Sequence, residues 1–405
     1  MVPEGWRTTK LGKVFKSRRE RGTAGLPTIS VTLRGGLVLR ESLDRKTDTT
    51  LSPEEHLLVR KGDIAYNMMR MWQGASGLAS FDAIVSPAYV VATPTKEIDP
   101  VFASYFFKSA RMIYLFWAYS YGLTKDRLRL YYPDFSLIPV VLPPAEEQRR
   151  IGKILTTCER AINIVGRIVQ NSAAQQRALL QKFFSESSTK GWKLHTIGSL
   201  GTTYGGLTGK SQEDFGTGVP YIPYLNIFTN PKIDLSHLDY VLIQPRERQH
   251  RVKYGDSFFT TSSEVPNEVG MSSVLLDEVG EIYLNSFCFG FRPHSFDVLT
   301  PEFSRFLFRS PRVRRSISHL AQGATRYNLP KGQFLRLSIP LPTVDEQLRI
   351  ANCLASAEAV VAKHKAQLGN LQALQQALTQ LLIPGKLRVM GNETPDPLVA
   401  VGMTR

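Results

Sequence analysis

The chain has 405 residues, of which 42% are hydrophobic and 21% charged, so two or three globular domains are expected and a disordered or fibrous protein is excluded. Fifty Lys and Arg against 35 Asp and Glu give a net charge of +15, which favours a polyanionic partner such as nucleic acid or an anionic membrane surface. No apolar stretch approaches the roughly 18 residues of a membrane span, no signal peptide begins the chain, and three separated cysteines predict a reduced, cytoplasmic compartment and no zinc or other metal site.

Residues 1–144 predict a mixed α/β domain. Short β-branched and aromatic runs such as Ile84-Val85 and Tyr89–Val91 alternate with Gly and Pro, a pattern typical of short strands, turns and a few helices. The Pro-containing segment Ile138–Pro144 closes the domain.

Residues 145–188 predict a long helix. Glu146 and Glu147 suit the positive end of a helix dipole, and no Pro follows for about 40 residues, which at about 1.5 Å each span roughly 60 Å. Apolar residues at alternating spacings of four and three predict a coiled coil. The alternative is a long amphipathic helix that packs only on its own domain.

The second half of the chain repeats the first. Gly5-Trp6-Arg7 recurs as Gly191-Trp192-Lys193, Gly62-Asp63 as Gly255-Asp256, Pro100–Met112 as Pro301–Val313, and Glu146–Ile151 as Asp345–Ile350. A second domain is therefore expected at residues 189–343, a second helix at 344–385 and a flexible tail at 386–405. The positions expected to pack between the helices are Ile151, Leu155, Ile162, Val169, Leu179, Ile350, Leu354, Val361, Leu368 and Leu378.

The positive charge lies mainly on the two globular parts. The net charge is +7 for residues 1–144 and +4 for 189–343, against +3 for 145–188 and +1 for 344–405. The domains are therefore expected to face DNA, and the helices to form the frame.

Four segments resemble the specificity (S) subunits of type I restriction–modification systems. Gly62–Pro94 resembles the middle of a target-recognition domain, Pro139–Ile151 and Pro340–Ile350 resemble its junction with the spacer helix, and Leu382–Leu387 resembles the C-terminal close of the family. The resemblance covers nearly all of residues 1–390.

The resemblance implies an α+β fold in which two mixed α/β target-recognition domains, in tandem repeat, are separated by two long helices that form an antiparallel coiled coil with pseudo-two-fold symmetry. It implies a non-catalytic subunit that reads an asymmetric bipartite target in double-stranded DNA. Two methyltransferase (modification) subunits and the restriction subunits are its implied partners. S-adenosylmethionine, ATP and magnesium would be bound by those partners, and this chain would bind no cofactor.

Candidate DNA contacts in the first domain follow two glycine-containing turns. Asn67, Arg70, Trp72 and Gln73 come after Gly62-Asp63, although the same run also suits a packed element with one exposed arginine. The basic cluster that includes Arg18 and Arg19 predicts either a phosphate-binding loop or a solvated face.

A Gly-x-Thr turn with a cation recurs in both halves. Gly122–Arg127 matches Gly323–Asn328, so the turns are expected either to bind phosphates or to lie as plain surface turns. The residues predicted here and nearby are Thr124, Lys125, Arg127, Thr325, Arg326, Asn328 and Lys331.

The segment Gly206–Ser211 resembles a nucleotide-binding P-loop only in part. A P-loop needs glycine where this chain has Tyr204, so we expect a DNA-domain loop in which Lys210 lies near DNA. The alternative function is an independent DNA-binding or DNA-bridging protein that self-associates through its helices. An enzyme with an unrecognised site is the third class considered.

Overall fold

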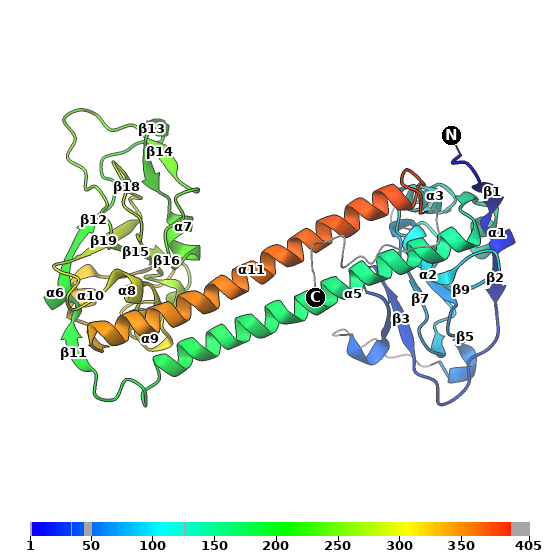
Figure 1. Ribbon diagram of the computed structural model, residues 1–405, viewed down its shortest axis with the longest axis horizontal. Helices are drawn as coiled ribbons and strands as arrows, with labels where there is room; N and C mark the ends of the chain where they lie inside the picture. Colours follow the sequence, from blue (N-terminus) through cyan, green and yellow to red (C-terminus); the bar gives the residue numbers. More distant parts are fainter. Residues whose placement is uncertain (1, 34, 44–50, 125–126, 390–405) are drawn as a thin grey trace. The chain divides into compact units, whose positions relative to one another are not determined.

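The computed structural model describes residues 2–33, 35–43, 51–124 and 127–389, which form two compact units (Figure 1). Unit 1 comprises the chain up to Gly166 together with the part from Ala366 onward, and unit 2 comprises Arg167–Lys365. None of the described helices combines the length and apolar content needed to span a bilayer.

Unit 1 begins with short strands, continues with three short helices and ends in a strand that leads to a long helix. Its elements are β1 (Arg7–Lys10), α1 (Leu11–Val14), β2 (Phe15–Arg18), β3 (Ile29–Thr32), β4 (Gly36–Leu39), β5 (Leu57–Val59), β6 (Ile64–Asn67), β7 (Ser76–Leu78), β8 (Ala83–Val85), β9 (Tyr89–Pro94), α2 (Pro100–Phe106), α3 (Ala110–Ala118), α4 (Tyr132–Leu137), β10 (Pro139–Leu142) and the start of α5 (Ala145–Phe183).

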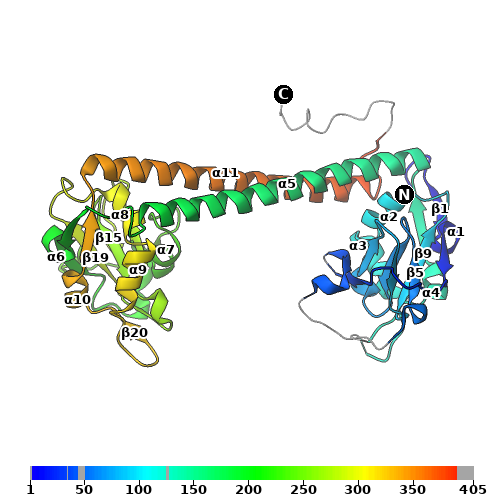
Figure 2. The same cartoon turned by 90° about the horizontal axis from the view of Figure 1, so that it is seen from below.

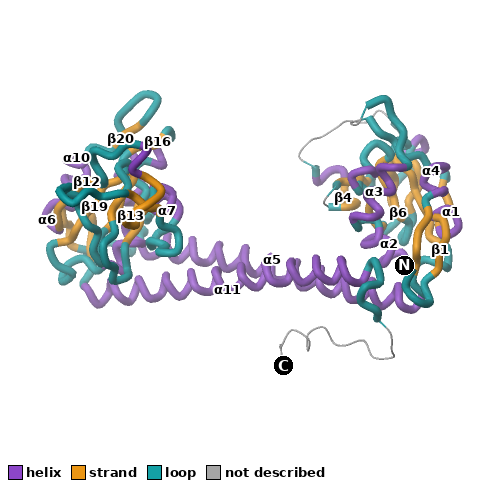
Figure 3. The backbone as a smooth tube through the Cα atoms, turned by 90° about the horizontal axis from the view of Figure 1, so that it is seen from above, coloured by secondary structure: helices purple, strands orange, loops and turns teal. Residues whose placement is uncertain are grey.

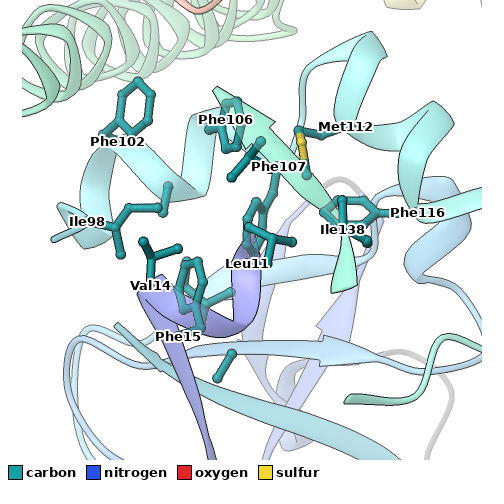
Figure 4. Packing of buried hydrophobic residues seen from close by; sticks show 14 of the residues in the cluster. Leu11, Val14, Phe15, Ile98, Phe102, Phe106, Phe107, Met112, Phe116 and Ile138 are labelled. Atoms are coloured by element: carbon teal, nitrogen blue, oxygen red, sulfur yellow. The ribbon is translucent and has the colours of Figure 1, made fainter. Parts of the chain in front are cut away.

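The central sheet of unit 1 is antiparallel, with strand order β2-β9-β6-β7. β1 pairs with β10, so Arg7 lies opposite Leu142 and the two ends of the domain are joined beside α5. Figure 4 shows the core, in which Phe15, Phe107, Phe116 and Ile138 belong to one buried cluster. Because these rings are fully or almost fully buried, the hydrophobic effect accounts for the close packing of the helices on the sheet.

Unit 2 repeats the four-stranded sheet, the two short helices after it and the closing strand of unit 1, which confirms the tandem repeat. Its elements are the end of α5, β11 (Lys193–Thr196), α6 (Ile197–Leu200), β12 (Gly201–Gly205), β13 (Phe215–Ile222), α7 (Tyr224–Thr229), β14 (Asp239–Val241), β15 (Ser257–Thr260), β16 (Ser262–Ser263), β17 (Ser272–Val274), β18 (Tyr283–Leu284), β19 (Cys288–Pro293), α8 (Pro301–Leu307), α9 (Pro311–Ser318), β20 (Tyr327–Asn328), α10 (Lys331–Arg336), β21 (Ser338–Leu341) and the first part of α11 (Val344–Leu382).

The sheet of unit 2 has the order β12-β19-β15-β17, which matches β2-β9-β6-β7 strand for strand. β11 pairs with β21 as β1 pairs with β10. Phe308 and Phe334 occupy the core as Phe107 and Phe135 do in unit 1. A further sheet of β14, β13 and β18 has no three-stranded counterpart among the described residues of unit 1.

The two long helices begin where the sequence predicts, at Ala145 and Val344, and each runs for 39 residues. Each starts directly after a domain-closing strand and carries two acidic residues in its first turn. α11 ends before Pro384 and Gly385, whose positive φ of 74° suits a helix C-terminus. The boundary between the two compact units falls within both long helices. Each unit therefore contains the start of one long helix and the end of the other.

Within each unit the two helix segments run antiparallel, which confirms the coiled-coil prediction. In unit 1, Ile151 and Leu155 near the start of α5 share a buried cluster with Leu382 at the end of α11. In unit 2, Leu179 near the end of α5 packs on the cluster that contains Leu354. Among the predicted packing positions, the buried ones are Ile151, Leu155, Ile350, Leu354 and Val361, and the half-buried ones are Ile162, Val169, Leu179, Leu368 and Leu378.

A buried glutamine fixes each long helix to its domain. The Gln148 side chain accepts a hydrogen bond from the Asp99 amide at 2.8 Å and donates to the carbonyls of Glu97 at 3.2 Å and Pro143 at 2.9 Å. Asp99 is also the N-cap of α2, since its carboxylate accepts from the Phe102 amide.

Gln347 makes the same three bonds in unit 2. It accepts from the Thr300 amide at 3.0 Å and donates to the carbonyls of Val298 at 2.7 Å and Pro342 at 3.0 Å. Thr300 caps α8 as Asp99 caps α2. The junction of helix and domain is therefore duplicated bond for bond.

The described start of the C-terminal tail is anchored to unit 1. The Glu147 carboxylate accepts hydrogen bonds from Arg388 Nε at 2.8 Å, from the Val389 amide at 3.3 Å and from the Trp6 indole at 3.1 Å. The expected flexibility therefore does not extend to Arg388 and Val389, and residues 390–405 lie outside the described residues.

Replacement of Gln148 tests the helix–domain junction. Gln148→Ala leaves one amide and two carbonyls without their partners at a site where the residue is only 1% exposed. We expect a loss of roughly 2–4 kcal/mol in the free energy of unfolding, measured by urea denaturation. Gln170→Ala, at an exposed position of α5, should change it by less than about 0.5 kcal/mol. Equal losses in the two variants would contradict the assigned role.

Candidate nucleic-acid interface

In unit 1 the structure brings together two of the segments predicted to contact DNA. The first, which we call turn segment 1, is Asn67–Gly74 after β6, and the second, hairpin loop 1, is Tyr121–Arg129 after α3. The Leu130 amide donates to the Met68 carbonyl at 2.9 Å, so the two lie side by side. Reciprocal bonds of 3.0 and 2.8 Å between Tyr121 and Arg129 close the hairpin loop.

Unit 2 has the same pair of segments. Turn segment 2 is Thr260–Gly270 and hairpin loop 2 is Gln322–Asn328, joined by the bond from the Leu329 amide to the Thr261 carbonyl at 2.9 Å. β16 and β20 pair directly, with Ser262 opposite Asn328. Figures 2 and 3 show the β20 loop at the end of the unit that is remote from α11. A ligand at the β20 loop would therefore lie away from the α11 segment of the same unit.

The hydrogen bonds correct the sequence alignment of the two hairpin loops. The closing pair is Tyr121 and Arg129 in unit 1 but Gln322 and Asn328 in unit 2, so loop 1 is two residues longer. Asn328 therefore corresponds to Arg129 and not to Arg127. Arg129 is exposed, and the fixed sequence offset concealed it as a candidate.

Hairpin loop 2 requires its glycine. Gly323 has φ +141°, and a Cβ there would lie 2.0 Å from the Arg326 carbonyl oxygen. In loop 1 a Cβ at Gly122 would lie 2.5 Å from the Arg127 carbonyl oxygen. The recurring Gly-x-Thr pattern thus reflects a tight backbone crossing in each loop. Thr124 in loop 1 and both Thr325 and Arg326 in loop 2 are exposed.

The predicted residues of turn segment 1 are partly structural. Met71 is fully buried, and the Asn67 side chain accepts from the Met69 amide at 2.9 Å, as a packed turn requires. Arg70 is exposed and donates to Gln73 at 3.4 Å, while the Trp72 indole donates to the Met69 carbonyl. The turn is therefore packed, with Arg70 exposed and Gln73 half-buried, and its contact with DNA stays a prediction.

Most of the predicted residues near hairpin loop 2 are exposed. Thr325, Arg326, Asn328 and Lys331 all lie at the surface. Arg326 donates to the Ser262 hydroxyl at 3.1 Å and its guanidinium lies 5.7 Å from the centre of the Phe287 ring. These contacts order the guanidinium while it remains accessible to a phosphate. In loop 1, Thr124 and Arg127 are exposed, and Lys125 lies outside the described residues.

Two predicted DNA contacts serve the fold. Arg18 donates to Asp63 at 2.7 Å, its side chain is only 14% exposed, and the hydrogen bond to Asp63 raises the pKa of its guanidinium above the ordinary value. Lys210 has a side chain only 2% exposed and donates to Glu247 and to the Leu242 carbonyl. We therefore remove Arg18 and Lys210 from the proposed interface, because each is already held by an intramolecular carboxylate. Arg19 is exposed and stays in it.

Turn segment 2 was not found from the sequence. Its Ser263, Glu264, Val265, Asn267 and Glu268 have neither a basic run nor a motif that repeats in the first half. The pairing of β16 with β20 and the bond from Arg326 to Ser262 place this segment beside hairpin loop 2. A search for polar residues after the second Gly-Asp turn, at the offset set by Gly62-Asp63, could have found them.

The described part of the chain contains no group of three or more His, Cys, Asp or Glu side chains arranged to hold a metal ion. Cys158 and Cys288 are buried thiols and Cys353 is exposed. The site presents guanidinium, amide and hydroxyl groups, which suit hydrogen bonds to phosphates and base edges, and carboxylates, which suit only donors on base edges.

Comparison with known proteins agrees with the fold. Residues 189–372 match the family model of the type I restriction modification DNA specificity domain. The chain resembles type I specificity subunits, as its sequence predicts.

The specificity subunit of the type I restriction enzyme MjaVIII of Methanocaldococcus jannaschii is 22% identical over 96% of this chain and 94% of its own. The crystal structure of the S subunit from M. genitalium has a TM-score of 0.54 at 14% identity and covers 93% of this chain and 96% of its own. That of the HsdS subunit from Thermoanaerobacter tengcongensis has a TM-score of 0.50 at 18% identity and covers 95% and 98%. The fold of the specificity subunits therefore extends over nearly the whole chain.

Arg326 tests the phosphate contact of hairpin loop 2. Arg326→Ala should lower the slope of log affinity for DNA against log salt concentration by nearly one unit, because one phosphate contact and its released counterion are lost. Binding is measured between about 50 and 200 mM salt.

Arg349→Ala is the matched control, since this exposed arginine lies on α11 and pairs with Glu346. Its slope should equal that of the unmodified chain, as should that of Lys210→Met. An unchanged slope for Arg326→Ala would remove loop 2 from the interface.

Proposed function

We propose that this chain directs separate methyltransferase and nuclease subunits to an asymmetric, two-part target in double-stranded DNA. Each unit would read one half of the target through its turn segment and hairpin loop. The observation that carries the proposal is the duplicated unit, whose scaffold bonds are the same in both copies while the exposed loop residues differ.

The difference between the two turn segments supports an asymmetric target. Turn segment 1 presents Arg70 and Gln73, which match acceptor-rich purine edges, whereas turn segment 2 presents Glu264 and Asn267. Identical loops would favour two copies of one half-site. Domains that dock on one face of a duplex favour half-site centres about one helical turn apart, roughly 34 Å, with an unread gap between them.

The catalytic steps belong, in this proposal, to partner chains. Two modification subunits would supply the S-adenosylmethionine chemistry, and restriction subunits would use ATP and magnesium. This chain would bind none of these cofactors and would act in the cytoplasm. The support comes from the family resemblance together with surface groups that suit binding to DNA.

Methylation mapping tests this function. Genomic DNA is sequenced for methylated adenines from host cells with this chain and from the same cells after its deletion. We expect one methylated motif that depends on the chain and consists of two unlike specified parts around an unspecified gap. A continuous motif, or methylation that persists after deletion, would overturn the proposal.

The second candidate function is an independent DNA-binding or DNA-bridging protein. The exposed apolar residues Ile164 of α5 and Val360 of α11 favour it, because they leave helix surface that a second copy could cover. Native mass spectrometry separates the two functions. The specificity-subunit function predicts one copy of this chain with two modification subunits, whereas two copies of this chain without them would support bridging.

A further inference from the structure

Each turn segment ends at a glycine whose backbone is in the left-handed region. This glycine packs on the helix pair of its unit, which is α2 and α3 in unit 1 and α8 and α9 in unit 2. Gly74 has φ +84° and Gly270 has φ +65°. A Cβ at Gly270 would lie 2.7 Å from both Ile317 and Leu329, and one at Gly74 would lie 3.4 Å from Ile113. The end of each turn segment is therefore seated closely on α3 or α9.

In unit 2 a single arginine holds the last residues of the turn segment. Arg314 of α9 donates to the carbonyls of Asn267 at 2.9 Å and Val269 at 2.6 Å, and also to the carbonyl of Gly270. Burial lowers the pKa of Arg314 to about 10, so the guanidinium stays charged at neutral pH. These three acceptors belong to one four-residue stretch, which a planar guanidinium with five donors can bind as a unit.

In unit 1 a lysine reaches the equivalent carbonyl. Lys108, between α2 and α3, donates from Nζ to the Gly74 carbonyl at 2.5 Å and to the Leu33 carbonyl at 3.4 Å. Both turn segments therefore end at a glycine carbonyl that accepts from a cation of the helix pair below.

The two cations come from different positions of the repeat. Lys108 aligns with Arg309, which instead donates to the carbonyls of Ile227, Phe228, Asn230 and Ser272. Arg314 aligns with Ile113, an apolar residue under Gly74. Repetition of the sequence alone would place the two cations at equivalent positions. They come from different positions and still bond to equivalent glycine carbonyls, which indicates that each turn segment needs a cation at its end.

We propose that Lys108 and Arg314 are positioning residues that set base discrimination at the two half-sites separately, each by fixing the end of one turn segment. This inference rests on the proposed function. Neither cation needs to touch DNA. Base readout by paired hydrogen bonds demands placement within about 0.5 Å, so a turn segment released at its end would still meet phosphates but would lose selectivity between bases.

The test uses the complex of this chain with its modification subunits and duplexes that carry the mapped target or one base change in either half. The discrimination ratio is the affinity for the target divided by that for the changed duplex. Arg314→Met should lower this ratio about tenfold in one half and leave the other within about twofold, and Lys108→Met should do the reverse. Lys108→Arg, which retains a cationic donor, should restore most of the ratio.

Arg312→Met is the matched control, because Arg312 lies on the same helix but donates to Thr189. Should Arg314→Met fail to assemble, Arg314→Lys retains the charge but not the planar donors, and it should show an intermediate ratio and faster hydrogen exchange of the amides of residues 267–270.

The inference is overturned if both ratios stay unchanged, if either variant lowers both halves equally, or if Arg312→Met has the effect of Arg314→Met. It is also overturned if the variants lower affinity for every duplex by the same factor, as a purely structural role would. If the unmodified complex itself shows no discrimination in either half, the proposed function fails instead.

Discussion

The architecture depends on one buried amide in each half of the chain. Gln148 and Gln347 each bond to the residue that caps the next helix pair and to a carbonyl at the end of the domain-closing strand. Removing the amide would leave these buried backbone groups without hydrogen-bond partners, which costs more free energy than the bonds themselves contribute. Substitution of either glutamine is therefore expected to destabilise the fold. The long helix therefore leaves each domain in a defined direction, and the heptad face meets its antiparallel neighbour within the same unit.

Each unit therefore consists of a scaffold, which the glutamine bonds hold to a long helix, and of the turn segment and hairpin loop that form the candidate interface. The scaffold bonds, the sheet order and the aromatic core are the same in both units, whereas the turn segments and hairpin loops differ in length and in exposed chemistry. The β14-β13-β18 sheet of unit 2 is a further difference between the units. Arg314 lies on α9 and Lys108 between α2 and α3. They connect the two regions, because each bonds to the end of a turn segment that differs between the units.

Much of the fold could be predicted from the sequence because it repeats and because its helices have a regular period. The matches at Glu146–Ile151 and Asp345–Ile350 located the helix starts, and the heptad located the buried face. The candidate interface was predicted less well, since ion pairs between residues far apart in the sequence cannot be read from spacing. Arg18 and Lys210 have the composition of DNA contacts, yet Asp63 and Glu247 hold them. A two-residue difference in loop length likewise concealed Arg129.

Site-specific photo-crosslinking tests most directly whether the two units read separate parts of one target. A photoreactive side chain is placed at position 124 in one preparation and at position 325 in another, and each complex is irradiated on the mapped duplex. Our account predicts two discrete crosslinked patches, one for each position, in opposite halves of the target and about one helical turn apart. Crosslinks from both positions to the same bases, or to DNA outside the target, would contradict it.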